Sequence, residues 1–266
     1  MNDQLKRAMW DLVRPIHSPF TRALRRRLGR NYPDHPEMEL PPPFDAIQLD
    51  VERHLHDYLH VSPQDISQII IVGALEADEV GRMQRVYPGA RFLCFEPNPT
   101  TYANLTRKFA GRLEVCVSRL ALARTPGKAR FYELSMVGNG SLLEPNVEAW
   151  AAAHKQSDKS ITAFEVEVST LDREAADLPT IDLLWMDVQG AEGEVLASGT
   201  ETLRRTKSVF LEVASVHSPY KGALLFPEIK ARLEAASFLC VGLGLDAWNG
   251  TGNAFFVKNF EKLAVI

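Results

Sequence analysis

The run Gln68-Ile69-Ile70-Ile71-Val72-Gly73 gives the clearest indication of the fold. Consecutive β-branched residues that end at a glycine are typical of a strand buried on both faces. A helical stretch follows to Tyr87, and Ala90 to Glu96 forms a second apolar strand. Asn98 and Pro99 suit the start of a helix, because Asn caps free amides and Pro tolerates the first helical position. This alternation predicts a parallel sheet covered by helices on both faces.

The alternation continues to the end of the chain. Further strands are expected at 113–117, 181–188, 208–213, 238–243 and 253–258, with helices from 188 to about 205 and over 223–236. The last two strands are joined by nine residues. This link is too short for a crossover helix, so the two strands must pair antiparallel. The predicted fold is α/β, a mostly parallel, doubly wound sheet that ends in an antiparallel hairpin.

Composition and charge exclude several classes of protein. The chain has 266 residues, of which 45% are hydrophobic and 24% charged, so it can bury a large core and is not a disordered or collagen-like chain. The net charge of −4 averages two unlike parts. Residues 1–30 carry eight Lys and Arg against two Asp, whereas the rest carries 22 against 32 Asp and Glu. The acidic main body does not favour nucleic acid as a partner.

The sequence predicts a cytoplasmic protein. It contains no apolar run of the length that a membrane helix needs and no apolar segment of a secretory signal. Cys94, Cys116 and Cys240 are far apart, and each lies in an apolar, strand-like run. An odd number of such thiols suits a reducing compartment, and their spacing does not favour a metal site.

Two domains are expected. Residues 1–60 form a leader in which short helical pieces precede the linker 31–44, with its five prolines, and a helical pattern over 45–60. The basic stretch 20–28 is either a solvated helix face packed on the domain or a contact with a membrane surface or partner protein. Residues 61–266 form the main domain, with an inserted cap at about 128–169 where the alternation breaks. The sequence does not indicate an oligomeric state.

Glu96 is a candidate ligand of a ribose. It ends the second strand, 23 residues after the glycine that ends the first. In doubly wound sheets the ligand lies beyond the carboxyl ends of the strands, and an acidic residue at about this spacing accepts the ribose hydroxyls. The apolar run before Glu96 sets where this side chain falls. Glu96 is therefore expected to hold an adenosine.

The loop after the first strand favours S-adenosylmethionine over a dinucleotide. A dinucleotide needs further glycines after Gly73, so that bare amides can cradle its pyrophosphate. Here the loop lacks them and carries Glu76, Asp78 and Glu79 instead. These carboxylates would repel a pyrophosphate but suit a cofactor with a sulfonium and an ammonium.

Several short motifs stand at or just after the predicted strands. In chain order they are Val72-Gly73-Ala74, Phe95-Glu96-Pro97-Asn98-Pro99, Ala121-Leu122 before Gly127, Gly140-Ser141-Leu142, Thr170-Leu171-Asp172, the run from Ile181 to Glu192, and Leu211-Glu212-Val213. Over residues 68–258 the chain resembles FkbM-type methyltransferases. The resemblance implies a Rossmann-like class I methyltransferase fold that binds S-adenosylmethionine and releases S-adenosylhomocysteine. It also implies O-methylation of a hydroxyl on a sugar, glycan or natural-product acceptor.

The resemblance and the loop together assign a set of cofactor-binding residues. They are Gly73, Ala74, Glu76, Asp78, Glu96, Pro97, Asn98, Ala121, Leu122 and Asp187. Three positions depart from the family pattern. Ile71 stands where an acid is common, Leu75 where Asn is common, and Ala77 where a second glycine is common. These departures leave an alternative open, in which the chain is a degenerate member that acts as a binding or scaffold module.

Methyl transfer to a hydroxyl needs alignment and a base. Asp187 ends the 181–188 strand and is the candidate base or cofactor-side acceptor, while a helix-capping role is its alternative. Glu212 ends the next strand, and His217 follows it, so these two resemble a base and its orienting partner. Glu192 is expected to cap its own helix. Gln189 stands where the family often has Glu, which argues against a metal site.

Overall fold

The structure, a computed structural model, describes residues 49, 51–59, 61–134, 138–147, 160–245 and 250–259. The predicted basic stretch and the proline-rich linker lie outside the described residues. In the part of the chain that is described, no helix has the length and apolar character needed to cross a membrane.

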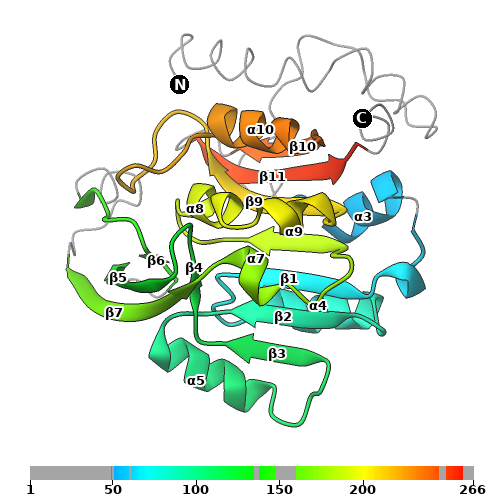
Figure 1. Cartoon of the computed structure of the whole chain (residues 1–266), viewed down its shortest axis with the longest axis horizontal. Coiled ribbons are helices and arrows are strands. Elements are labelled where there is room, and N and C mark those ends of the chain that lie inside the picture. The colour runs from blue at the N-terminus through cyan, green and yellow to red at the C-terminus, as the bar shows by residue number, and fades with distance from the viewer. Residues whose placement is uncertain are drawn as a thin grey trace.

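A seven-stranded sheet forms the centre of the molecule (Figure 1). Its order is β10-β11-β9-β8-β1-β2-β3. The strands are β1 (Gln68–Val72), β2 (Arg91–Phe95), β3 (Val115–Ser118), β8 (Leu183–Met186), β9 (Ser208–Ala214), β10 (Phe238–Leu245) and β11 (Thr251–Lys258). The first five run parallel to one another, whereas β11 runs antiparallel to both β9 and β10. The predicted α/β fold with its terminal antiparallel hairpin is therefore confirmed.

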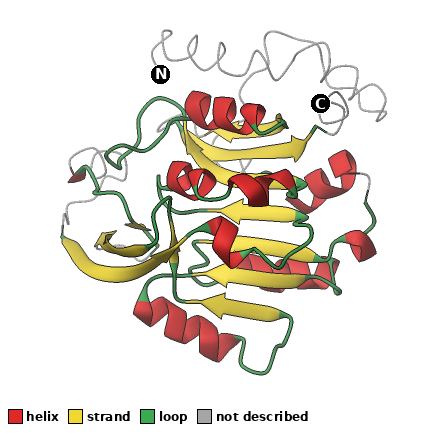
Figure 2. Cartoon of the chain, viewed as in Figure 1, coloured by secondary structure: helices red, strands yellow, loops and turns green. Residues whose placement is uncertain are grey.

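Helices cover both faces of this sheet (Figure 2). Helices α3 (Val51–Leu59), α4 (Asp78–Val86) and α5 (Pro99–Lys108) share one core cluster with the strands. Helices α7 (Leu171–Glu174), α8 (Glu192–Ala197), α9 (Thr200–Arg204) and α10 (Phe226–Ala235) share the other. The sequence of β1 is apolar throughout because both faces of the strand are buried. Ile69 and Ile71 lie in one cluster, and Ile70 and Val72 lie in the other.

A second, four-stranded sheet occupies much of the predicted cap. It contains β4 (Ala121–Leu122), β5 (Gly127–Leu134), β6 (Gly140–Ser141) and β7 (Ile161–Ser169), in the order β4-β7-β5-β6. Strands β5 and β7 pair antiparallel, residues 127–134 with residues 161–168. Figure 1 shows this sheet beside the end of the main sheet at which β2 and β3 terminate.

Helix α5 begins as the sequence predicts. The side chain of Asn98 accepts hydrogen bonds from the amides of Thr100 and Thr101, at 2.8 and 3.1 Å. Pro99 occupies the first helical position. This cap fixes the turn between β2 and α5, and therefore the place of Glu96.

One expectation was wrong in detail. The helix expected from 188 to about 205 is two short helices, because Gly199 packs against Leu171 where a Cβ would lie 2.5 Å from the leucine side chain. Helix α3, expected within the leader, packs its buried Val51 and Leu55 into the main core.

Among the described glycines, Gly73 leaves the least room for a side chain. Its φ is +82°, and a Cβ built there would lie 1.8 Å from the carbonyl oxygen of Asp187.

Gly73→Ala should lower the free energy of unfolding by at least about 2 kcal/mol, because left-handed strain adds to a backbone clash. Gly81→Ala is the matched control. Gly81 lies inside α4 with open space around it, so this change should stabilise by about 0.5–1 kcal/mol. Urea unfolding of both variants checks the pair, and equal stabilities would contradict it.

Candidate active site

A pocket lies at the carboxyl ends of β1, β2 and β8, where the strand order reverses. Its empty volume, open solvent included, is about 690 Å³. Val72, Phe95 and Asp187 line it from the main sheet, and Phe131 and Gly140 line it from the second sheet. Doubly wound sheets bind their ligands at this point of strand reversal.

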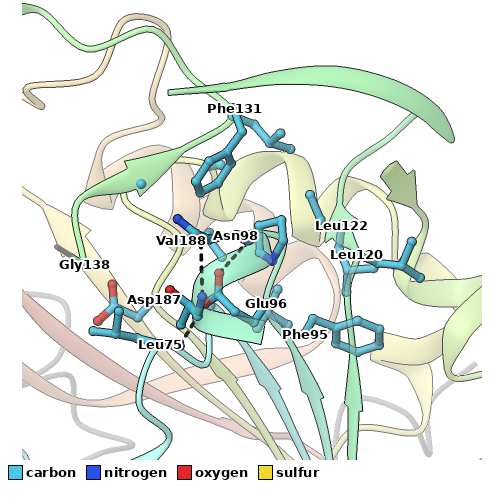
Figure 3. Close-up of a pocket in the computed structure, with 18 of the residues that line it drawn as sticks. Leu75, Phe95, Glu96, Asn98, Leu120, Leu122, Phe131, Gly138, Asp187 and Val188 are labelled. Carbon is cyan, nitrogen blue, oxygen red and sulfur yellow. Dashed lines mark hydrogen bonds between the residues drawn. The ribbon is translucent and has the colours of Figure 1, made fainter. Parts of the chain in front are cut away.

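Glu96 lies at the centre of this pocket, between two turns (Figure 3). Its Oε2 accepts a hydrogen bond from the Leu75 amide at 2.9 Å, and its Oε1 accepts one from the Asn98 amide at 2.8 Å. Only 6% of the residue is exposed. Burial raises the pKa of this carboxyl, and the two amide hydrogen bonds oppose that rise. Each oxygen keeps a lone pair that can accept a further hydrogen bond from a ligand.

Two residues of the loop after β1 adopt a backbone conformation that is unfavourable for their side chains. Leu75 has φ 44° and Ala77 has φ 49°, both in the left-handed region. Asn and Gly adopt that region more readily than Leu and Ala, so this chain bears strain where the family pattern does not. The Leu75 amide nevertheless reaches Glu96. Ile71 is fully buried in the core cluster opposite the pocket side of β1.

An apolar wall closes one part of the pocket. Phe131, Leu120 and Leu122 contribute side chains to it (Figure 3). Gly140 permits this arrangement, because a Cβ there would lie 2.5 Å from the Phe131 ring. Glu133 lines the pocket from the same face of β5, two residues on, and its Oε1 accepts a hydrogen bond from the Asn98 side chain at 2.9 Å. The second sheet is thereby joined to the turn after β2.

One side-chain amide bridges two carboxyl groups at the edge of the pocket. The side-chain nitrogen of Gln189 donates to Asp187 Oδ1 at 2.8 Å and to Glu212 Oε2 at 3.0 Å. The Tyr220 hydroxyl lies 3.1 Å from Gln189 Oε1 and donates to it. The same hydroxyl lies 3.2 Å from the Asn139 carbonyl oxygen. The hydrogen bond from Tyr220 to Gln189 Oε1 sets the orientation of the amide, so that its nitrogen faces the two acids.

The two acids share one proton most readily. Burial raises the pKa of Glu212 well above its usual range, and the neighbouring Asp187 charge raises it further. Asp187 opens onto the pocket, yet protein packed around its carboxylate also raises its pKa. Hydrogen bonds from Gln189 and Glu212 counter that rise at Asp187. Glu212 is therefore the protonated member, and Asp187 is the member that holds negative charge.

A second hollow, of about 600 Å³, lies on the other side of the turn 187–192. Glu212, His217 and Tyr220 line it, together with Gln189. The expected Glu212–His217 pair does not form, since in the described part of the chain Glu212 bonds Gln189 and no hydrogen bond joins it to His217. His217 is exposed in the loop after β9.

Most of the cofactor residues expected from sequence lie together. Seven line the first pocket, namely Gly73, Glu96, Pro97, Asn98, Ala121, Leu122 and Asp187. Ala74 is buried just behind, and its amide donates to the Phe95 carbonyl. Glu76 and Asp78 are exposed and do not line the pocket. Lys108 binds the Asp78 carboxylate at 2.7 Å and also the Glu76 carbonyl.

Sequence reasoning missed two groups of pocket residues. Phe131 and Glu133 were detectable in principle, because residues two apart on a strand share one face. The contacts of Tyr220 were not, because it lies in a loop and meets Gln189, 31 residues away, only in the folded chain. From the sequence, Gln189 stands out only because it replaces the Glu of the family pattern. Its hydrogen bonds to two acids were not predicted.

The residues of the pocket fit S-adenosylmethionine. Glu96 can accept the two ribose hydroxyls, and the wall of Phe131, Leu120 and Leu122 suits an adenine ring. Asp187 lies at another part of the pocket, where negative charge suits a sulfonium and an ammonium. None of the described residues that line the pocket is a Lys or Arg, so a pyrophosphate would find no cation there.

The fold and this pocket define a class I methyltransferase that uses S-adenosylmethionine as its cofactor. Comparison with known proteins agrees, because the model of the methyltransferase FkbM domain matches residues 72–240. The chain belongs to the FkbM methyltransferase family.

One relative is the 2-O-methyltransferase NoeI of Sinorhizobium fredii, which is 29% identical over 165 residues. The match covers 59% of this chain and 66% of NoeI.

Solved structures give more distant matches. Fibrillarin of Methanococcus jannaschii has a TM-score of 0.42 at 13% identity, covering 74% of this chain and 69% of that one. The precorrin-6y C5,15-methyltransferase of Geobacter metallireducens has a TM-score of 0.41 at 14% identity, covering 81% and 94%. The METTL16 methyltransferase domain has a TM-score of 0.47 at 10% identity, covering 88% and 75%.

Glu192 caps the turn below the two acids, and its titration should appear in the stability of the protein. Its Oε1 accepts the Val188 and Gly190 amides at 3.1 and 3.4 Å, and burial raises its pKa from 4.5 to about 7. The folded state therefore holds a proton that the unfolded state has lost, so stability falls as pH rises from about 4.5 to about 7. In Glu192→Gln, the decrease in the free energy of unfolding over this pH range should be smaller by up to about 3 kcal/mol.

Urea unfolding at pH 5 and pH 8 measures this difference. Glu194→Gln is the control, because Glu194 bonds Arg124 at the surface at 3.2 Å. It should keep the wild-type dependence on pH. An unchanged dependence in Glu192→Gln would show that the buried carboxyl does not titrate in this range.

Proposed function

We propose that this protein is an O-methyltransferase that acts on a hydroxyl of a small-molecule or glycan acceptor. The proposal depends on the position of the Asp187 carboxylate. This group faces the cofactor pocket, and Gln189 holds it beside a second acid. A hydroxyl is a poor nucleophile at neutral pH, so its methylation calls for a base at the point of transfer. The 2-O-methyltransferase activity in the name of NoeI supports the same reaction.

Binding comes first in the proposed mechanism. Glu96 orients the ribose, because the Leu75 and Asn98 amides fix both of its oxygens. Gly73 lets the backbone after β1 approach the turn after β8, so the cofactor can lie close to Asp187. S-adenosylmethionine supplies a methyl group that its sulfonium already activates. Alignment is then the largest contribution that the chain makes.

Proton transfer involves Asp187. Its carboxylate would accept the proton that the acceptor hydroxyl loses; the bound cofactor would supply the methyl group and leave as S-adenosylhomocysteine. Glu212 carries the shared proton, and this keeps a second negative charge away from Asp187. Gln189 and Tyr220 are positioning residues, because their hydrogen bonds set the direction of the Asp187 carboxylate.

Loss of the Glu96 carboxylate should weaken the cofactor. Glu96→Gln replaces one acceptor oxygen by an amide, so the affinity for S-adenosylhomocysteine should fall by about 10- to 100-fold in calorimetry. Glu76→Gln is the matched control, because Glu76 is an acid of the same region that does not line the pocket. Its affinity should stay within about twofold. Full affinity in Glu96→Gln, or no binding by the wild type, would contradict the assignment, and the latter would favour a non-catalytic binding module.

Loss of the Asp187 carboxylate should stop transfer more than binding. Asp187→Asn keeps the shape and the hydrogen bond from Gln189 but removes the base, so methyl transfer should fall by about 10²- to 10⁴-fold. Mass spectrometry of methyl glycosides incubated with S-adenosylmethionine measures the methyl ether formed. Thermal unfolding checks the fold of the variant. Transfer at the wild-type rate would exclude Asp187 as the base.

A further inference from the structure

The second hollow is built differently from the cofactor pocket. The two are separated by the turn 187–192, whose residues contribute to both. Asp187 and Val188 face the first pocket, whereas Gln189 and Glu192 line the second. The Gln189 side chain bonds Asp187 on one side and Glu212 on the other. A molecule in the second hollow would therefore contact Gln189, whose amide holds the group that we propose as the base.

The walls of this hollow combine apolar and hydrogen-bonding groups. Val213, Ala214 and Leu224 supply apolar surface. Ser218 and Thr251 supply hydroxyls, and the Gln189 and Glu212 side chains add polar groups from the turn side. Such a mixture matches a ring that carries hydroxyls on its rim and C–H groups on its faces.

The described walls of the hollow offer an anion no fixed positive charge. Glu192 and Glu212 line it, Glu212 holds a proton, and the negatively charged Asp187 lies behind Gln189. None of the described lining residues is a Lys or Arg. His217 is the one lining residue that could carry positive charge, and it is exposed at the rim. A phosphate, sulfate or carboxylate placed inside would lose water without gaining a cation, and the negative charge of Asp187 behind Gln189 would repel it. A neutral hydroxyl, in contrast, can both donate to and accept from these carboxyl groups.

We infer that this hollow binds the acceptor and selects a neutral, hydroxylated molecule over an anionic one. The inference rests on the proposed function, because the hollow is an acceptor site only if Asp187 is the base of methyl transfer. It adds the place of binding and the charge class of the acceptor. Sugars without acidic substituents near the reacting hydroxyl belong to that class, whereas uronates and sugar phosphates do not.

A matched pair of glycosides tests the charge class. Methyl β-D-glucopyranoside and methyl β-D-glucopyranosiduronate differ in one group, a hydroxymethyl in place of a carboxylate. Saturation-transfer NMR on the protein loaded with S-adenosylhomocysteine reports the binding of each. The neutral glycoside should bind at least about 10-fold more tightly than the uronate. Ser218→Lys places a cation in the hollow and should reduce that preference to below about threefold.

A second pair of variants tests the place of binding. Ala214→Trp fills the hollow at the end of β9 and should abolish binding of the neutral glycoside, whereas Ala110→Trp adds the same side chain at an exposed position outside both pockets. Calorimetry with S-adenosylhomocysteine shows whether each variant keeps the cofactor pocket. Absent cofactor binding in the wild type would overturn the proposed function itself. Intact cofactor binding with equal affinity for both glycosides, with no binding of the neutral one, or with binding that survives Ala214→Trp would overturn only this inference.

Discussion

The cofactor pocket depends on the Glu96 carboxylate and the two amides that hold it. One amide belongs to Leu75, in the turn after β1, and the other belongs to Asn98, in the turn after β2. One side chain therefore fixes two turns that belong to different strands. The same turns carry Gly73 and the Asn98 cap of α5, so a shift of Glu96 would disturb both the helix start and the approach to β8. The cost of burying this acid is offset because its hydrogen bonds are already made.

The turn 187–192 organises the chemistry around that pocket. It directs Asp187 to the cofactor side and Gln189 to the second hollow, and Glu192 accepts amides of the turn itself. Gln189 adopts a left-handed backbone conformation, with φ 54°. Such strain is common at functional sites, where the surrounding structure enforces it. Here the Tyr220 hydroxyl and the two acids hold the Gln189 side chain on three sides.

Sequence predicted the strands and the position of Glu96 because buried apolar runs show where strands end. It did not predict the directions of loop side chains. Glu76 and Asp78 share a region with Glu96, but the left-handed residues Leu75 and Ala77 turn the chain so that both acids face solvent. The bond between Gln189 and Glu212 was equally hidden, because it joins residues 23 apart on neighbouring strand ends. Strand order and register decide such contacts, and no local pattern encodes them.

A crystal structure with S-adenosylhomocysteine would show directly whether Glu96 holds the cofactor. The ribose hydroxyls should lie within about 3 Å of the Glu96 oxygens, with the adenine against Phe131 and the sulfur turned toward Asp187. The Leu75 and Asn98 amides should still bond Glu96 in that complex. A nucleoside bound elsewhere, or a ribose held without Glu96, would contradict the account.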